Sequence, residues 1–183
     1  MIENEVKIAF DDVETARRAV HAAGGRLVVP RRLIDDKLFD TLDRALRQDG
    51  RTLRLRRAAE LAFITFKGPV RAGPVKSREE LETEVGDADL AEAILLSLGF
   101  RQIFRAQKYR EEYELHHAHL TVDEAPIGVF VEIEAQPADI ERVTGLLGRT
   151  AADHRLDSYQ RLHARWCEVR GLTPGDMVFP QVS

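Results

Sequence analysis

Cysteine is almost absent from the sequence, and long apolar runs are absent altogether. The single cysteine, Cys167, excludes an internal disulfide and is compatible with a reducing cytosol, where we expect it to be a small, buried hydrophobic residue. No apolar stretch approaches the roughly eighteen residues that cross a membrane, and acidic residues close to Met1 are unlike a signal peptide. These absences predict a cytoplasmic protein that makes no membrane contact.

An excess of basic charge is also missing. The chain has 27 Lys and Arg residues against 31 Asp and Glu residues, a net charge of -4, and its bases alternate with acids. Bulk binding of nucleic acid is therefore not expected. With 183 residues, of which 44% are hydrophobic, residues 1–183 are long enough to form one domain with a real core.

The first residues of the chain alternate in a pattern typical of a β-strand. Successive side chains of a strand point to opposite faces, so Glu3, Glu5 and Lys7 share one face. Ile2 and Val6 lie on the other face. Taken alone, this pattern is ordinary, because antiparallel sheets commonly keep one face in water.

The same alternation returns in later segments that are bounded by turn residues. Two arrangements accommodate so many charges: an open sheet with a solvated face, or a closed sheet whose wet interior holds ions. A closed interior would place carboxylates that bind divalent cations beside Arg and Lys side chains that bind phosphate, so a metal-bound polyphosphate would satisfy both. The polar rows are Arg54 and Arg56; Thr65 and Lys67; Arg78, Glu80, Glu82 and Glu84; Lys108 and Arg110; Thr121 and Asp123; and Glu132 and Glu134.

Four helices are predicted between these strands. The first follows a cap at Asp11 or Asp12 and ends at Gly24, and the second follows Asp87. The third spans residues 137–147, and the fourth runs from Asp157 or Ser158 to Gly171. The apolar stripe of the second helix is predicted at Leu90, Ile94, Leu95 and Leu98. Packing such stripes on the apolar strand faces gives an α+β fold with helices outside and charges inside.

Two further segments have alternative interpretations. The Gly- and Pro-rich segment 68–77 is either a mobile loop at a pocket mouth, where Arg71 or Lys76 meets an anion, or a plain hairpin connection, which is favoured. His116, His117 and His119 are better explained as surface turn residues than as a transition-metal site.

The charged motifs together resemble the CYTH or triphosphate tunnel metalloenzyme family, which includes thiamine triphosphatases, inorganic triphosphatases and class IV adenylyl cyclases. The first match is the E-x-E-x-K pattern of Glu3, Glu5 and Lys7, close to the N-terminus. The later matches follow in family order: L-R-L-R at 53–56, T-F-K-G at 65–68, R-x-E-x-E at 78–82, K-x-R at 108–110, V-D-E at 122–124, G-x-F-V-E-I-E at 128–134, and endings at 158–159 and 176–179.

This resemblance implies an eight-stranded antiparallel closed β-barrel, open at both ends as a tunnel, with a charged interior and helices packed outside. It implies Mg²⁺ or Mn²⁺ held by Glu3, Glu5, Asp123, Glu132 and Glu134, with Glu80 and Glu82 as supporting acids. The implied phosphate contacts are Lys7, Arg54, Arg56, Lys67, Arg78, Lys108 and Arg110. Lys7 is also the implied catalytic residue, nearest the attacking water.

Hydrolysis of a triphosphate such as tripolyphosphate or thiamine triphosphate is the first functional prediction. Leu38 stands where triphosphatases of the family often have a tyrosine, a departure that weakens the assignment to the inorganic triphosphatases. A class IV adenylyl cyclase acting on ATP is the alternative, although the candidate rings for a purine site, Phe63, Phe104, Tyr109 and Phe130, have the periodicity of core residues. A non-catalytic polyphosphate- or nucleotide-binding module is the third reading. The expected partner is a small-molecule triphosphate, and a homodimer is left open.

Overall fold

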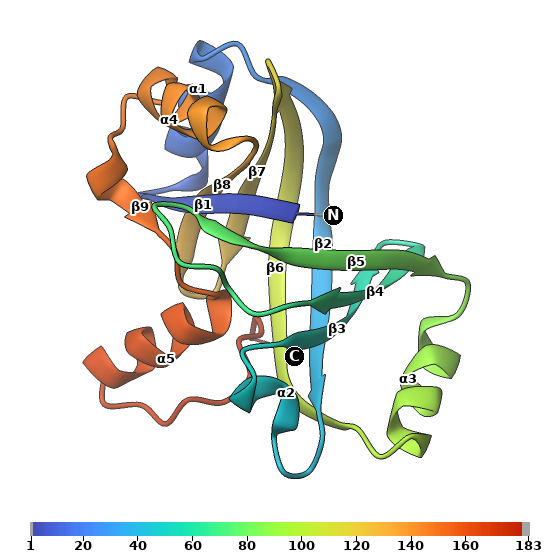
Figure 1. Cartoon of the computed structure of the whole chain (residues 1–183). Helices are drawn as coiled ribbons and strands as arrows, with labels where there is room; N and C mark the ends of the chain where they lie inside the picture. The colour runs from blue at the N-terminus through green and yellow to red at the C-terminus, as the bar shows by residue number, and fades with distance from the viewer. Residues whose placement is uncertain (1, 181–183) are drawn as a thin grey trace.

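A computed structural model of the chain describes residues 2–180 and contains a closed antiparallel β-barrel (Figure 1). Eight strands follow the order β5-β4-β3-β2-β6-β7-β8-β1, and β1 pairs again with β5 to close the barrel. A ninth strand, β9 (His154–Arg155), pairs with β1 beyond this closure. The barrel strands are β1 (Ile2–Phe10), β2 (Arg26–Asp40), β3 (Thr52–Ala58), β4 (Leu61–Lys67), β5 (Lys76–Val85), β6 (Arg101–Leu115), β7 (Ala118–Ala125) and β8 (Gly128–Glu134).

The alternation of β1 determines what lies on each side of the barrel wall. Glu3, Glu5 and Lys7 are buried on the inner face, whereas Val6 and Ile8 are buried on the outer face. A strand buried on both faces needs polar partners inside and an apolar cover outside. The predicted α+β barrel with a charged interior and external helices is confirmed.

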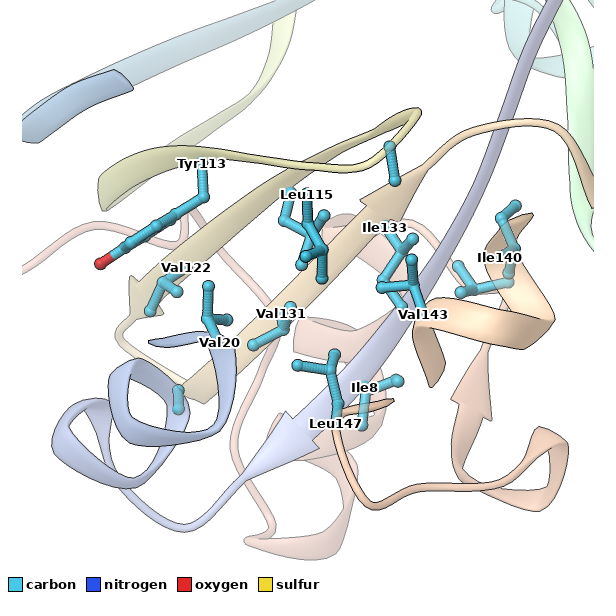
Figure 2. Close-up of a cluster of buried hydrophobic side chains, with 14 of the residues drawn as sticks. Ile8, Val20, Tyr113, Leu115, Val122, Val131, Ile133, Ile140, Val143 and Leu147 are labelled. Carbon is cyan, nitrogen blue, oxygen red and sulfur yellow. The ribbon is translucent and has the colours of Figure 1, made fainter. Parts of the chain in front are cut away.

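Two helices cover the apolar outer face of β1, β7 and β8. They are α1 (Val13–Ala22) and α4 (Pro137–Leu146), which contact these three strands in the main core. Figure 2 shows Val20 of α1 and Val143 of α4 meeting the strand side chains around Val131 and Ile133. The remaining helices are α2 (Ala45–Gln48), α3 (Ala88–Ser97) and α5 (Tyr159–Val169), with a short 3-10 turn, η1 (Ala151–Asp153). Within residues 2–180, no helix combines the length and the apolarity needed to cross a bilayer.

Side-chain caps confirm three of the four predicted helix starts, and α4 begins at the predicted Pro137 without such a cap. Asp12 accepts a hydrogen bond from the backbone N–H of Thr15 at 2.7 Å, which resolves the choice between Asp11 and Asp12. Asp87 and Ser158 cap α3 and α5 in the same way. Each cap satisfies a backbone donor that the helix itself cannot satisfy.

The predicted apolar stripe of α3 is wrong in part. Leu95 is buried with Ala91 against Phe39 and Leu55 in a second core cluster. The small side chain of Ala91 lies on the contact face, and the larger apolar residues on either side of this narrow contact remain outside it. Three residues of the predicted stripe are exposed, at 59%, 52% and 70%: Leu90, Ile94 and Leu98.

Strand β2 was not predicted, because its alternation is interrupted. Its pairing with β6 shifts register between Leu27 and Val29 and again between Val29 and Arg32. Pro30, which has no backbone N–H, lies within the second shift. At each of these two shifts β2 has one residue more than β6. The extra residue moves the following side chains to the opposite face, so no single period runs through the whole strand.

The smaller predictions are mostly confirmed. Cys167 is buried on α5, and His116 and His117 are exposed in the turn between β6 and β7. His119, however, lies on β7 and is half-buried beside the interior, so its placement in the turn was wrong. The segment 68–75 connects the paired strands β4 and β5, as a hairpin connection does, with Arg71 exposed.

A matched pair of substitutions on α3 tests the observed contact face. Leu95→Ala should lower the free energy of unfolding by about 2–5 kcal/mol, because it opens a cavity against Leu55. Leu90→Ala on the exposed side should change it by no more than about 0.5 kcal/mol. Urea unfolding followed by circular dichroism measures both, and equal losses would contradict the observed orientation of the helix.

Candidate functional site

The barrel encloses a cavity of about 730 Å³, here called the barrel cavity. Side chains of both charges point into it from strands that are distant in the sequence. Every residue assigned a site role from the sequence lines it except Asp123, which lies beneath its surface. The predicted residues at this surface are Glu3, Glu5, Lys7, Arg54, Arg56, Lys67, Arg78, Glu80, Glu82, Lys108, Arg110, Glu132 and Glu134.

Acidic side chains gather where β1 meets β5 and β8. Glu5 lies opposite Glu134 in the β1–β8 register. Lys67 Nζ lies 2.7 Å from Glu3 and 2.9 Å from Glu80, so one ammonium group holds two carboxylates. Burial, reinforced by the charge of Glu5, raises the pKa of Glu3 to about 7. Burial and a neighbouring carboxylate therefore disfavour the charged form of Glu3 even beside Lys67.

Glu5 is shared by two lysines. It accepts hydrogen bonds from Lys7, two residues along the same strand, and from Lys76 on β5. Burial opposes the charged form of Glu5, yet the ammonium groups of Lys7 and Lys76 hold its pKa well below the usual range. Lys76 had been placed in the 68–77 loop, but it begins β5 and its side chain is buried in the barrel cavity.

Asp123 anchors two of the predicted phosphate-binding cations. It accepts two hydrogen bonds from Arg110, at 2.7 and 2.6 Å, and one from Lys108 at 2.6 Å. Tyr159 donates a further hydrogen bond at 2.7 Å from the first turn of α5, and its ring lies 4.3 Å from the Lys108 ammonium. Asp123 and Tyr159 thus fix the direction in which Lys108 and Arg110 point into the cavity.

Glu132 completes this group on β8. Arg110 Nη2 lies 2.6 Å from the Glu132 carboxylate, and Lys7 Nζ lies 3.3 Å from it. Lys7 is the residue of β1 that stands opposite Glu132 in the β1–β8 register. Burial, reinforced by the charge of Arg110, nevertheless lowers the pKa of Lys108 to about 8. Burial therefore disfavours the charged form of Lys108 even with two carboxylates beside it.

Arg54 and Arg56 project from β3 into the cavity. Arg56 makes two hydrogen bonds with Asp36, at 2.7 and 2.9 Å, and burial of Asp36 is outweighed by Arg56, so its pKa falls below the usual range. Arg54 Nη2 lies 3.0 Å from Thr65 and 3.1 Å from Glu82. Arg54 Nε is buried and, within residues 2–180, has no hydrogen-bond partner. Such a donor is available to an oxygen of a ligand.

A polar cluster further along the barrel was missed from the sequence. Arg32 on β2 contacts Glu112 on β6, and His119 Nε2 lies 3.1 Å from the same carboxylate. Glu112 could have been found by extending the period of Lys108 and Arg110 by one step. Lys76 could have been found in the same way, as the step before Arg78 on β5. Arg32 and Asp36 were harder to find, because they follow a register shift and share their strand face with the apolar Ile34 and Leu38.

The carboxylates near β1 fit a hard divalent cation. Glu3, Glu5 and Glu134 carry the oxygen atoms that Mg²⁺ and Mn²⁺ prefer as ligands, and Glu80 lies beside them on Lys67. Burial and the charge of Glu80 raise the pKa of Glu134, a repulsion that an added cation would relieve. Across residues 2–180, no three acidic, histidine or cysteine side chains are already grouped as a metal site. Binding would therefore exchange some of the ion pairs described above for metal contacts.

Comparison with known proteins gives the same assignment along most of the chain. The CYTH domain model matches residues 1–156. "Putative adenylate cyclase MJ0240" of Methanocaldococcus jannaschii is 30% identical over 141 residues, which cover 76% of this chain and 80% of that protein.

Solved structures share the barrel. A protein from Vibrio parahaemolyticus described as a "putative adenylate cyclase" matches with a TM-score of 0.78 at 20% identity, over 88% of this chain and 97% of that one. HpAC1 from Hippeastrum, described as a "putative adenylyl cyclase" with a dominant triphosphatase activity, matches with a TM-score of 0.64 at 18% identity, over 94% and 97% of the two chains. With the family model matched over residues 1–156, this chain belongs to the CYTH family.

Proposed function

We propose that this chain hydrolyses a triphosphate held in the barrel cavity, with Mg²⁺ or Mn²⁺ as its metal. The observation that carries the proposal is the gathering of carboxylates and cations around one enclosed space. Glu3, Glu5 and Glu134 line the cavity beside β1 and β8, and Arg54, Lys108 and Arg110 line it from β3 and β6. A divalent metal would bind the carboxylates while a phosphate chain binds the cations, so a metal-bound triphosphate suits the whole lining.

The basic residues would hold the phosphate oxygens. Phosphoryl transfer spreads charge over equatorial oxygens and asks mainly for positioning and neutralisation, which buried guanidinium groups supply. Arg54 Nε is already available as a donor, and Asp123 keeps Arg110 pointed into the cavity. The proposed phosphate contacts are Lys7, Arg54, Arg56, Lys67, Arg78, Lys108 and Arg110.

The acids would hold the metal. Glu3, Glu5, Glu132 and Glu134 are the proposed ligands or their immediate supports, with Asp123 acting through Lys108 and Arg110. Glu80 and Glu82 would orient Lys67 and Arg54. When bound, the metal supplies charge neutralisation and a water of lowered pKa.

Lys7 would act as a cation and not as a base. Burial opposes its charge, but Glu132 and Glu5 raise its pKa above the usual range. Lys7 therefore remains an ammonium group, which can hold a phosphate oxygen or orient water but cannot accept a proton from it.

Adenylyl cyclase activity is the second candidate. The curated relatives carry adenylate cyclase names, and the rings of Phe63 and Phe104 line the barrel cavity, where a base could stack. In that reaction the ribose 3'-hydroxyl of ATP attacks the α-phosphorus and pyrophosphate leaves. A module that only binds would not need the carboxylates beside the basic residues, so it is the least favoured reading.

Product analysis distinguishes these reactions. The protein should release inorganic phosphate from tripolyphosphate when Mg²⁺ or Mn²⁺ is present, and chelation of the metal should stop the release. The same incubation with thiamine triphosphate and with ATP, followed by chromatography, shows which organic substrate is used. Cyclic AMP with pyrophosphate from ATP, without phosphate release from tripolyphosphate, would replace the hydrolase proposal by the cyclase.

Removing one proposed metal carboxylate should impair turnover. Glu5→Gln and Glu134→Gln should each lower metal-dependent kcat/KM by at least about tenfold, because an amide binds a divalent cation more weakly than a carboxylate. Glu114→Gln, near the exposed end of β6 where Glu114 pairs with Arg26, is the matched control. Melting curves verify folding, and full activity of both site variants would remove the carboxylates from the metal site.

Two arginines on one strand test the phosphate contacts. Arg54→Ala should raise KM about ten- to a hundredfold, the effect expected for one charged hydrogen bond to phosphate. Arg57→Ala provides the control, because Arg57 lies on the outer face of β3 and pairs with Asp89 of α3. Steady-state kinetics with tripolyphosphate measures both, and an unchanged KM for Arg54→Ala would exclude this contact.

A further inference from the structure

A second hollow adjoins the barrel cavity at one end of the barrel. It has a volume of about 910 Å³ and is called the vestibule here. Residues of α2, of the β4–β5 connection and of the start of α5 line it, and Figure 1 shows α2 and α5 toward the same end of the molecule. Lys76 and Arg78 line both spaces, so the vestibule continues directly from the barrel cavity.

Basic side chains outnumber acidic ones around the vestibule, and four of them form ion pairs: Arg51 with Asp49, Lys76 with Glu5, Arg78 with Glu3, and Arg161 with Asp157. Six basic side chains and two acidic ones line it, whereas the barrel cavity mixes the two signs. A concave surface lined by one sign of charge concentrates ligands of the opposite sign. The basic residues are Arg44, Arg47, Arg51, Lys76, Arg78 and Arg161, and the acids are Asp40 and Asp157.

Both acids are already engaged. Asp40 is almost fully buried and accepts hydrogen bonds from the backbone N–H groups of Leu46 at 2.9 Å and Arg47 at 3.0 Å. Asp157 lies 2.6 Å from Arg165, a residue outside the lining. Neither carboxylate forms an ion pair with Arg44 or Arg47.

Arg44 and Arg47 therefore carry unbalanced charge. Within residues 2–180, neither guanidinium group takes part in an ion pair. Arg44 also has a φ of 62°, a left-handed backbone conformation that is costly for a residue other than glycine. Asp40 holds the following turn in place, so both arginines are presented to the vestibule by a fixed backbone.

We propose that the vestibule binds the phosphates of a linear polyphosphate that extend beyond the three in the barrel cavity. The inference rests on the proposed function, since it assumes a triphosphate unit at Lys108 and Arg54. Lys76 and Arg78 would carry the chain from one space to the next, and Arg44 and Arg47 would bind its outer phosphates. A cationic organic group, such as the thiazolium of thiamine, would be repelled in the same place.

Binding measurements without turnover test this proposal. Titration calorimetry of the metal-free protein, with a chelator present, gives the Kd of tripolyphosphate and of a longer linear polyphosphate of defined length. The longer chain should bind more tightly by about fivefold or more, as expected for added contacts to two arginines. The double variant Arg44→Gln/Arg47→Gln should lose this advantage and keep the Kd of tripolyphosphate.

A control variant accounts for net charge. Arg18→Gln/Arg142→Gln removes the same charge from exposed positions on α1 and α4, and it should leave the advantage of the longer chain intact. Equal affinity of the two chains for the unchanged protein, or an advantage that survives in Arg44→Gln/Arg47→Gln, would overturn the proposal. ATP affinity that falls in this variant while polyphosphate affinity does not would assign the vestibule to a nucleoside instead. If the unchanged protein does not bind tripolyphosphate either with the chelator or with Mg²⁺ added, the result would count against the proposed function itself.

Discussion

Burial of charge inside a closed sheet is the constraint on which the rest of this structure depends. Removing an ion from water costs several kcal/mol unless partners replace the lost hydration. Asp123 illustrates the solution, because it is fully buried and accepts hydrogen bonds from Lys108, Arg110 and Tyr159. The charged face of every strand must turn inward for such partners to meet. The apolar faces then turn outward, which is why α1 and α4 are needed as a cover.

The ion pairs also leave room for ligand chemistry, because several charged groups are shared between two partners. Lys67 divides its charge between Glu3 and Glu80, and the acids nearby still repel one another. A cation placed among them and an anion placed beside Lys108 would exchange existing contacts for new ones with little movement of the backbone. The backbone of the barrel wall would stay rigid while the charged side chains exchange their ion-pair partners for contacts with the ligand.

Much of this site could be predicted from the sequence, because strand alternation is regular where both faces are buried. Period alone placed Glu3, Glu5 and Lys7 on one strand face, and the family resemblance carried by the order of the motifs implied the barrel and the roles of these residues. Arg32 and Asp36 were not assigned a site role, because a register shift precedes them and the apolar Ile34 and Leu38 share their strand face. The exposed side of α3 was misassigned because sequence hydrophobicity does not show how narrow a helix contact is. Tyr159 reaches the barrel from a helix, and no periodicity in the sequence indicates which strand residue such a side chain will meet.

The seam formed by β1 has a consequence for how the protein folds. Its first residues pair with β5, while its longer pairing, from Glu5 to Phe10, is with β8 near residue 130. Contacts so distant along the chain give a high contact order, which slows folding because a large loop must close before the contacts form. During synthesis, β1 emerges long before β8. The edge of β1 that pairs with β8 therefore stays unpaired while most of the chain is made. Glu5 and Glu134 face each other only after β8 has paired with β1. Ligand affinity would therefore measure the fraction of molecules whose barrel has closed.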